Sequence, residues 1–374
     1  MPVTVREANT PSDYRKALKF TFNLYRDNPN WVPPLIGEEM ETFNPKKNPA
    51  LEFCETKTWL AERDGRIVGR ITGILNRRFI EQWKDLHARF GWLEFIDDAE
   101  VADSLFDAAE AWARERGMTA IVGPMGFTDF DKEGLLVEGF DELSTFAMLY
   151  NHPWYKDHLE RRGYVKEVDW IERQVRVPAE GIPEKVMRVS ELVFKRKGLR
   201  ALTVRRAKDY KPYIPAIFAL LEDTYAHLYG YVSLTEKLRD LYADRYFSFI
   251  DPDFTKLVLD SEGKLAAVGI SMPSLSRAAQ KAKGRLFPFG LFHFLRAMKK
   301  PEILDLYLVA VRKDLQNLGL NSILMNEITA NAIRRGVKFA ETNAELESNA
   351  AIQSFWKFYD AREHKRRRVY RKDL

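Results

Sequence analysis

The residues best placed to do chemistry lie between an apolar stretch, Leu304 to Val311, and a long amphipathic segment, Ser322 to Arg335. The apolar stretch predicts a strand, and the periodic apolar residues after it predict a helix. Between the two, Gly319 lets the backbone come close to a ligand because glycine has no Cβ. The first turn of a helix offers unpaired N–H groups and the positive end of the helix dipole. This junction is therefore predicted to bind an anion such as a diphosphate, the alternative being a plain strand-to-helix turn.

A second polar group follows that helix. Side chains two residues apart point to the same face of an extended strand. The polar residues with this spacing are Glu341, Asn343, Glu345 and Glu347. A carboxylate beside a substrate can accept a proton, and a solvated polar strand edge explains the same pattern equally well.

Composition excludes several other kinds of site. Cys54 is the only cysteine, so neither an internal disulfide nor a zinc site built from several thiolates can form, and we expect a packed thiol and no metal. Hydrophobic residues at 45% and charged residues at 30% are typical of a globular protein. Apolar runs are too short for a membrane helix and the first six residues lack a signal core, so a cytoplasmic location is expected.

The order of predicted elements indicates a duplication. A chain of 374 residues is long enough for about two domains. Residues 178–200 carry proline, glycine and a short charged helix and are expected to link residues 1–177 to residues 201–374. Each side predicts a strand, one or two helices, a hairpin, a long amphipathic helix, a strand, a last helix and a closing strand. This order predicts two tandem α/β domains with mixed sheets.

Turn and cap signals support this assignment. Hairpins are predicted at Asp64–Gly65 in the first half and at Ser261–Lys264 in the second. The long helices predicted over residues 100–116 and 322–335 each stop at a glycine, Gly117 or Gly336.

Within this order of elements, the junction at Gly319 resembles the acyl-CoA motif of the GNAT acyltransferase superfamily. In that motif a strand ends in Val and leads to Gln or Arg, two residues, Gly, one residue, and Gly or Ala. Val311, Gln316 and Gly319 match, whereas Asn321 stands at the Gly or Ala position. The resemblance implies acyl-CoA or acetyl-CoA as co-substrate, with its pantetheine paired to the backbone of Val309, Ala310 and Val311. The amides implied to hold its diphosphate are those of Gln316, Asn317, Leu318, Gly319, Leu320 and Asn321.

The resemblance also implies roles in the reaction. In the superfamily an Asn begins the last helix near the pantetheine, as Asn349 does here, and a Tyr seven residues later protonates the departing thiolate. Trp356 occupies that position, and because an indole N–H does not ionise usefully, the usual general acid is missing. A carboxylate near the preceding strand takes the proton from the amine, and Glu347 and Glu341 are expected in that role.

The first half lacks the anion loop. Asp97, Asp98 and Glu100 lie at the start of its long helix, where their carboxylates repel a diphosphate. We therefore expect residues 1–177 to form a degenerate GNAT-like domain. CoA is expected to bind only in residues 201–374, with the acceptor pocket between the halves.

Motifs along nearly the whole chain are similar to the bacterial ceramide synthase-like branch of this superfamily. They include Val68 to Ile71, Glu94 to Asp98, Gly123 to Met125, Tyr150 with Asn151, Glu347 with Asn349, and Arg368 with Tyr370. Characterised members of the branch acylate the amine of a long-chain base with a fatty acyl-CoA. The resemblance thus implies an N-acyltransferase acting on an amine, with a lipid amine, a small polar amine and a protein N-terminus all open as acceptors. The alternative is a non-catalytic GNAT-fold module that binds a lipid, a membrane or a partner, with which Trp356 is consistent.

An insertion in the second half is both basic and apolar. No acidic residue occurs from Ser274 to Lys300. Its basic residues are Arg277, Lys281, Lys283, Arg285, Arg296, Lys299 and Lys300. After Pro288 and Gly290, its apolar residues predict one helical face made by Leu291, Phe294, Leu295 and Met298. Such a helix can lie at the anionic inner membrane surface or cap an apolar tunnel, or it can pack on the first domain with its charges solvated.

A second basic run, Lys365 to Arg368, lies in the predicted closing strand. We expect a solvated basic edge strand here. No zinc spacing, helix-turn-helix pattern or aromatic RNA-binding motif accompanies the run, so no nucleic-acid partner is expected.

Overall fold

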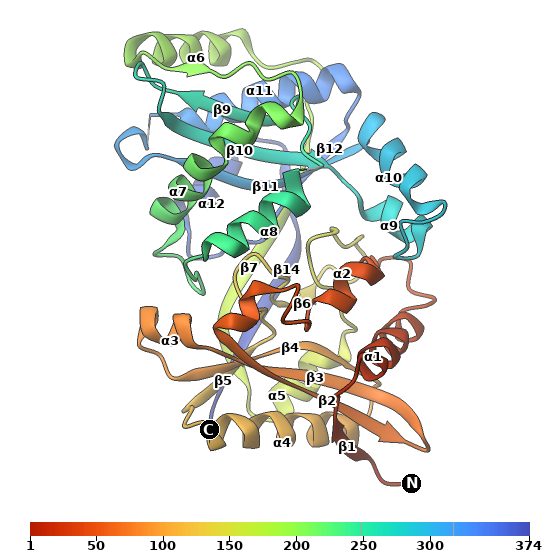
Figure 1. The fold of residues 1–374 in the computed structure, drawn as a ribbon. Coiled ribbons are helices and arrows are strands. Elements are labelled where there is room, and N and C mark those ends of the chain that lie inside the picture. Colours follow the sequence, from red (N-terminus) through yellow and green to blue (C-terminus); the bar gives the residue numbers. More distant parts are fainter. Residues whose placement is uncertain (248, 317) are drawn as a thin grey trace.

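A computed structural model of the protein describes residues 1–247, 249–316 and 318–374, and one mixed sheet runs through its length (Figure 1). The strands of the first half are β1 (Thr4–Glu7), β2 (Cys54–Arg63), β3 (Arg66–Asn76), β4 (His87–Phe95), β5 (Ala120–Gly123), β6 (Leu135–Glu138) and β7 (Val165–Arg176). Its helices are α1 (Pro11–Leu24), α2 (Ile36–Glu41), α3 (Arg77–Trp83), α4 (Ala99–Glu115) and α5 (Trp154–Arg161).

The second half repeats the pattern after a connecting helix, α6 (Glu184–Lys197). Its strands are β8 (Arg200–Ala201), β9 (Thr255–Leu259), β10 (Leu265–Pro273), β11 (Ile303–Val311), β12 (Phe339–Thr342), β13 (Glu345–Leu346) and β14 (Ala361–Asp373). Its helices are α7 (Ile214–Tyr225), α8 (Glu236–Phe247), α9 (Ser276–Ala282), α10 (Gly290–Lys299), α11 (Leu320–Arg335) and α12 (Ala350–Phe355). Short 3-10 turns lie at Pro49–Glu52, Ala207–Tyr213, Lys313–Leu315 and Trp356–Phe358.

Local signals set the boundaries of these elements, as the sequence predicted. Asp64 and Gly65 both have positive φ, 54° and 71°, and join β2 to β3 in a two-residue hairpin. Gly117 with φ 73° follows α4, and Gly336 with φ 74° ends α11.

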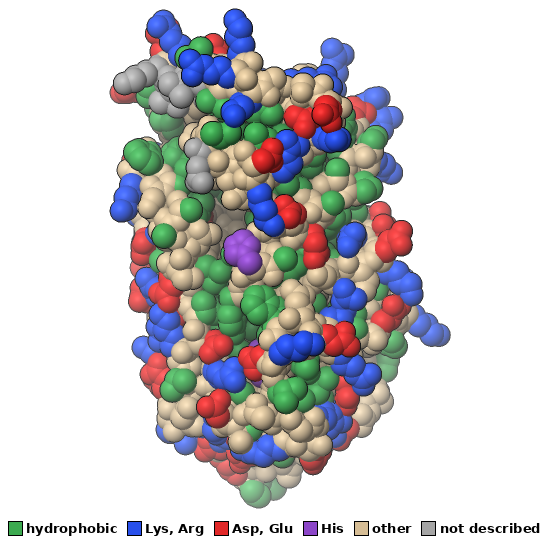
Figure 2. All heavy atoms as spheres, turned by 90° about the vertical axis from the view of Figure 1, so that its left-hand side faces the viewer, with side chains coloured by type: hydrophobic (Ala, Val, Ile, Leu, Met, Phe, Trp, Pro, Cys, Tyr) green, Lys and Arg blue, Asp and Glu red, His purple; other side chains and the backbone are tan. Residues whose placement is uncertain are grey.

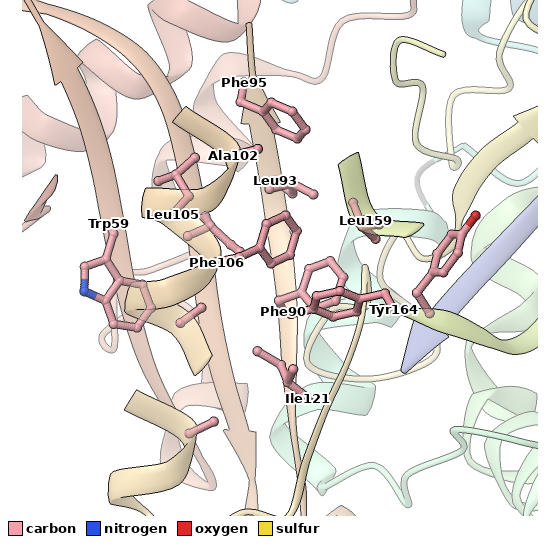
Figure 3. Close-up of a cluster of buried hydrophobic side chains, with 14 of the residues drawn as sticks. Trp59, Phe90, Leu93, Phe95, Ala102, Leu105, Phe106, Ile121, Leu159 and Tyr164 are labelled. Atoms are coloured by element: carbon pink, nitrogen blue, oxygen red, sulfur yellow. The ribbon is translucent and has the colours of Figure 1, made fainter. Parts of the chain in front are cut away.

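The core of the first half lies between α4 and the strands β2 to β4. Aromatic and aliphatic side chains from both layers interlock there, including Phe90 and Phe106, and Tyr164, just before β7, packs against both rings (Figure 3). Close packing depends on glycine, because a Cβ on Gly73 would lie 2.9 Å from the Trp112 ring. Helix α4 is capped at its start by Asp98, whose side chain accepts a hydrogen bond from the amide of Val101.

The closing strands of the two halves are exchanged. The sheet runs in the order β1-β2-β3-β4-β5-β14-β7-β12-β11-β10-β9-β8. The last strand of the chain, β14, therefore lies between β5 and β7 of the first half, while β7 pairs with β12 of the second half. The ribbon shows β7 and β14 crossing from one half into the other (Figure 1). The two halves thus share one sheet.

The expectation that Lys365 to Arg368 form a solvated edge is wrong. These residues lie on β14 in the middle of the sheet, where the side chains of Lys365 and Arg367 are fully buried. Both pair with the equally buried Glu172 on β7, with Lys365 Nζ 3.2 Å from Glu172 Oε2. Burial disfavours the ionised carboxylate, but Arg367 and Lys365 lower the pKa of Glu172 to about 2. Paired charges explain how a basic run can occupy an interior strand.

The basic and apolar insertion lies between β10 and β11, as predicted. Its first helix, α9, packs on the first half, where Gln280 Nε2 donates to the carbonyls of Pro29 and Trp31, each at 2.8 Å. The amide of Ile36 donates to the carbonyl of Gly284 at 2.9 Å. One side of the insertion is therefore fixed to the first half.

Candidate active site

A cavity of about 800 Å³ lies between the two halves. Its walls are α7, the second half of β11, the start of α11, residues 342–346, α12 and the loop 129–133 of the first half. Helices α7 and α12 lie on the left side in Figure 1, and Figure 2 shows hydrophobic side chains gathered in the middle of that side. Both halves therefore contribute to one site.

Strand β11 has an uncovered edge in this cavity. It pairs with β12 only from Ile303 to Leu306, after which the two strands diverge. Val309, Ala310 and Val311 lie beyond that point and line the cavity. The free edge is held by Tyr225, whose hydroxyl donates to the carbonyl of Val309 at 2.8 Å. A ligand that extends along this edge would replace the phenol as partner.

The predicted anion loop opens on the same cavity. Gly319 has φ 82°, begins α11, and has no atom within 4 Å of the place where a Cβ would lie. No side chain of the described residues caps the helix, and its first turn has no acidic residue. The first amides of the helix are therefore suited to an anion. Gln316 Nε2 donates to the carbonyl of Val311 at 3.1 Å and closes the loop. Gln316, Gly319, Leu320 and Asn321 line the cavity, Leu318 does not, and Asn317 lies outside the described residues.

The corresponding helix start in the first half is already occupied. Asp98 accepts the amide of Val101 at 3.2 Å and pairs with Arg63, and Glu100 lies in the first turn of α4. The capped helix start and its acidic side chains therefore disfavour an anion at this position.

Glu345 is the carboxylate of the second half that lines the cavity. Trp356 Nε1 lies 2.8 Å and 2.9 Å from its two oxygens, and Arg173 of β7 donates to Oε2 at 3.0 Å. Burial raises the pKa of Glu345 to about 7, and the hydrogen bonds from Trp356 and Arg173 oppose that rise. A group that titrates near neutral pH can both accept and return a proton.

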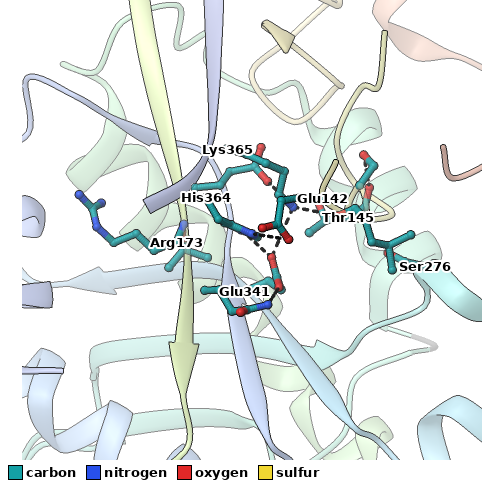
Figure 4. Close-up of polar contacts among 12 residues, drawn as sticks. Glu142, Thr145, Arg173, Ser276, Glu341, His364 and Lys365 are labelled. Atoms are coloured by element: carbon teal, nitrogen blue, oxygen red, sulfur yellow. Dashed lines mark hydrogen bonds and ion pairs between the residues drawn. The ribbon is translucent and has the colours of Figure 1, made fainter. Parts of the chain in front are cut away.

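Glu341 and Glu347 lie elsewhere, and neither lines the cavity. Glu341 is buried on β12, where His364 Nε2 lies 2.7 Å away and Lys365 Nζ 3.4 Å away. Figure 4 shows His364 and Lys365 converging on Glu341, while Arg173 points away from them. Burial opposes ionisation of Glu341, but the contacts with His364 and Lys365 hold its pKa below the usual value.

Glu347 directly follows β13 and pairs with Lys166 and Arg366. The four polar residues do not share a face because β12 ends at Thr342, and two irregular residues precede β13. The alternation of side chains between the two faces of the strand is therefore interrupted between Thr342 and Glu345.

Asn349 lines the cavity at the start of α12. Its side chain accepts a hydrogen bond from the amide of Ile352 at 3.3 Å and so caps that helix.

Acidic residues of the first half face the same cavity, which sequence reasoning missed. Asp129, Asp131 and Glu133 lie on the loop after β5. Burial raises the pKa of Asp129 to about 7 and that of Glu133 well above its usual value. A cationic ligand would be attracted to this loop and would favour its ionised form. Among residues 1–247, 249–316 and 318–374, no group of three or more His, Cys, Asp and Glu is placed to hold a metal ion.

A second cavity, of about 210 Å³, continues from the first toward α9 and α10. The two share Met148, Met272 and Tyr307 as lining residues. Apolar side chains on its walls include Trp31 and Leu35 of the first half and Leu275 and Phe294 of the insertion. Charged side chains such as Glu94 and Lys132 also line it.

Comparisons with known proteins agree with this architecture. No protein-family profile matches the chain. It is 29% identical to the bacterial ceramide synthase of Caulobacter vibrioides over 384 residues, covering 100% of this chain and 98% of that protein. It is 28% identical to the protein YghO of Escherichia coli, covering 99% of this chain and 95% of that protein.

Solved structures share the fold at low sequence identity. A tandem GNAT protein from the clavulanic acid biosynthesis pathway superposes with a TM-score of 0.57 at 12% identity, covering 99% of this chain and 98% of that one. A GCN5-related N-acetyltransferase from Sphaerobacter thermophilus superposes with a TM-score of 0.54 at 13% identity, covering 99% of this chain and 95% of that one. The chain therefore shares the fold of tandem GNAT proteins and is similar over its whole length to the bacterial ceramide synthase of Caulobacter vibrioides.

Proposed function

We propose that this protein transfers an acyl group from acyl-CoA to the amine of a lipid with a long aliphatic chain. One arrangement carries the proposal: a free strand edge, an uncapped helix start and a carboxyl with a pKa of about 7 line the same cavity. The first two can hold the two polar parts of acyl-CoA, and the third can move the proton that amide formation releases.

Acyl-CoA would lie along β11. The pantetheine amides would pair with the backbone from Val309 to Val311, replacing the Tyr225 hydroxyl. The diphosphate would accept hydrogen bonds from the amides around Gly319 at the start of α11. This register directs the thioester toward Glu345, in the part of the cavity where β11 and β12 diverge.

The reaction would then be a direct transfer. The neutral amine nitrogen attacks the thioester carbonyl carbon, a C–N bond forms, and the C–S bond breaks to release the thiolate of CoA. Glu345 accepts the proton that the nitrogen loses. Because a thiol with a pKa of about 8.5 holds a proton more tightly than a carboxyl with a pKa of about 7, Glu345 can pass that proton to the thiolate. Trp356 then acts as a positioning residue that holds Glu345, and no separate general acid is needed.

The acceptor end of the cavity supports a cationic head and an apolar tail. Asp129 and Glu133 attract an ammonium group, and the smaller cavity beyond Met148, which has apolar side chains among its walls, offers room for an aliphatic chain. The relative from Caulobacter vibrioides is named as a ceramide synthase, which is consistent with a lipid amine.

Release of free CoA thiol tests the proposal. Wild-type protein is mixed with acyl-CoA of several chain lengths and a panel of amines, namely a long-chain base, a short alkyl amine and a peptide N-terminus. We expect thiol release and amide product with the long-chain base. Tight acyl-CoA binding without turnover for any amine would support the binding-module alternative, and turnover restricted to the peptide would refute the lipid acceptor.

A further inference from the structure

Hydrophobic side chains are exposed together on the outer side of the insertion. Phe287, Phe289, Phe292 and Leu295 have exposed fractions of 75%, 79%, 65% and 56%. Other exposed large apolar side chains of the described chain, such as Leu86, Leu192 and Phe358, lie singly on distant segments. Exposed apolar residues gathered on one short segment indicate a binding surface, whereas scattered ones are normal. We call the outer side of residues 277–300 the α9–α10 surface.

Uncompensated positive charge surrounds these side chains. All seven basic residues between Arg277 and Lys300 are exposed, and none forms an ion pair with another described residue within 4 Å. The insertion contains no acidic residue to balance them. The occupant of this surface must therefore be both apolar and negatively charged.

We propose that the α9–α10 surface docks on an anionic phospholipid bilayer. Phe287, Phe289, Phe292 and Leu295 would enter the headgroup boundary while the basic side chains contact lipid phosphates. A second copy of the chain fits poorly, because a symmetric contact would bring seven positive charges against seven. No helix of the described residues is long and apolar enough to cross a membrane, so the contact would be peripheral.

The inner side of the same helices explains what this contact would serve. Phe294 of α10 is buried and lines the smaller cavity, as does Leu275 just before α9. Helices α9 and α10 therefore lie between the proposed bilayer contact and the smaller cavity, which continues toward the active site. Figure 1 shows both helices on the right of the molecule, opposite α7 and α12. A lipid could thus enter from the membrane on one side while CoA enters from water on the other.

Vesicle co-sedimentation tests the contact independently of the proposed reaction. Extruded vesicles of phosphatidylethanolamine with phosphatidylglycerol are compared with phosphatidylcholine vesicles at low and high salt. We expect binding to the anionic vesicles only, and high salt should weaken it. Each basic residue in contact with the bilayer should raise the affinity roughly fivefold. F289S/F292S and R296Q/K299Q should each bind at least about tenfold more weakly.

Matched controls lie on α6, where L192S removes an exposed apolar side chain and R196Q/K197Q removes exposed charges. Both should bind vesicles like wild type. The circular dichroism spectrum and thermal unfolding midpoint of F289S/F292S should match those of wild type, which shows that the variant is folded.

Three results would overturn the proposal: equal binding to both vesicle types, wild-type binding by F289S/F292S, or a wild-type dimer in light scattering that the variant converts to a monomer. The last result would identify the surface as a contact between copies.

Discussion

At the residue level, Trp356 and Glu345 would together take the place of the tyrosine that the resemblance to GNAT enzymes implies. The indole cannot supply a proton to a thiolate, but it donates to both oxygens of Glu345 and fixes that carboxyl in the cavity. Burial keeps the pKa of Glu345 near 7, where a carboxyl exchanges protons readily at physiological pH. A single group would then serve as base and acid in turn.

A pH profile tests this role. Glu345 must be ionised to accept a proton, so the rise of kcat/KM with pH should include a limb near pH 7, separate from the later one that neutralises the free amine. W356F removes a hydrogen bond that favours the ionised carboxylate, so the rising limb should move to higher pH. E345Q should lower kcat by about 10²- to 10⁴-fold while acyl-CoA affinity stays near wild type.

The matched control is E347Q, which removes a carboxylate of the same segment that lies outside the cavity. E347Q should keep the rise of kcat/KM near pH 7 and most of the wild-type activity. A limb lost in E347Q but unmoved in W356F would show that the proton acceptor is not Glu345.

At the scale of elements, β14 holds the two halves together through buried charges. Arg367 and Lys365 neutralise Glu172 between β14 and β7. R367M should lower the free energy of unfolding by about 3–5 kcal/mol, because it leaves Glu172 buried without its main partner. R366M, on the same strand with a partly exposed side chain, should cost about 1 kcal/mol or less.

Urea unfolding of both variants checks this expectation. The folded-state pKa of Glu172 is lowered, so its contribution is present above the unfolded pKa of about 4.5 and is lost as pH falls toward about 2. The difference between wild type and R367M should therefore shrink below pH 4.5 or so. Equal destabilisation by R366M and R367M would contradict the assignment of the stabilising pair.

Elements defined by local chemistry could be predicted from the sequence. The turn at Asp64–Gly65 and the glycines after α4 and α11 lie where expected, because backbone conformation at those positions depends on neighbouring residues. The partner of a strand depends on distant residues, so the exchange of β7 and β14 could not be predicted. The break after Thr342 had no signal either, and it is what moves Glu345 rather than Glu341 or Glu347 into the cavity.

At the scale of the whole molecule, the shared sheet makes the two halves interdependent. Residues 1–177 alone lack β14, which separates β5 from β7, and residues 201–374 alone lack β7 beside β12. Each fragment would expose unpaired strand edges and an open core. We therefore expect the full chain to unfold in one cooperative transition.

Expression of fragments checks this interdependence. Residues 1–177 alone should give no folded protein by circular dichroism and amide NMR dispersion, as should residues 201–374 alone. Co-expression of 1–199 with 200–374 should restore a soluble complex. A folded, monomeric 1–177 would contradict the account of the shared sheet.

The loop at Gly319 is proposed to hold the diphosphate of acyl-CoA, and calorimetry of acyl-CoA binding tests this placement. G319E places a carboxylate in the proposed anion site, and G336E places the same side chain at a glycine of similar φ at the other end of the same helix, with open space around both. We predict that G319E weakens acyl-CoA binding by at least about a hundredfold, while G336E binds like wild type. The backbone strain of the two substitutions is alike, but only the carboxylate of G319E would repel the bound anion. Unchanged affinity in G319E, or an equal loss in both variants, would contradict the claim.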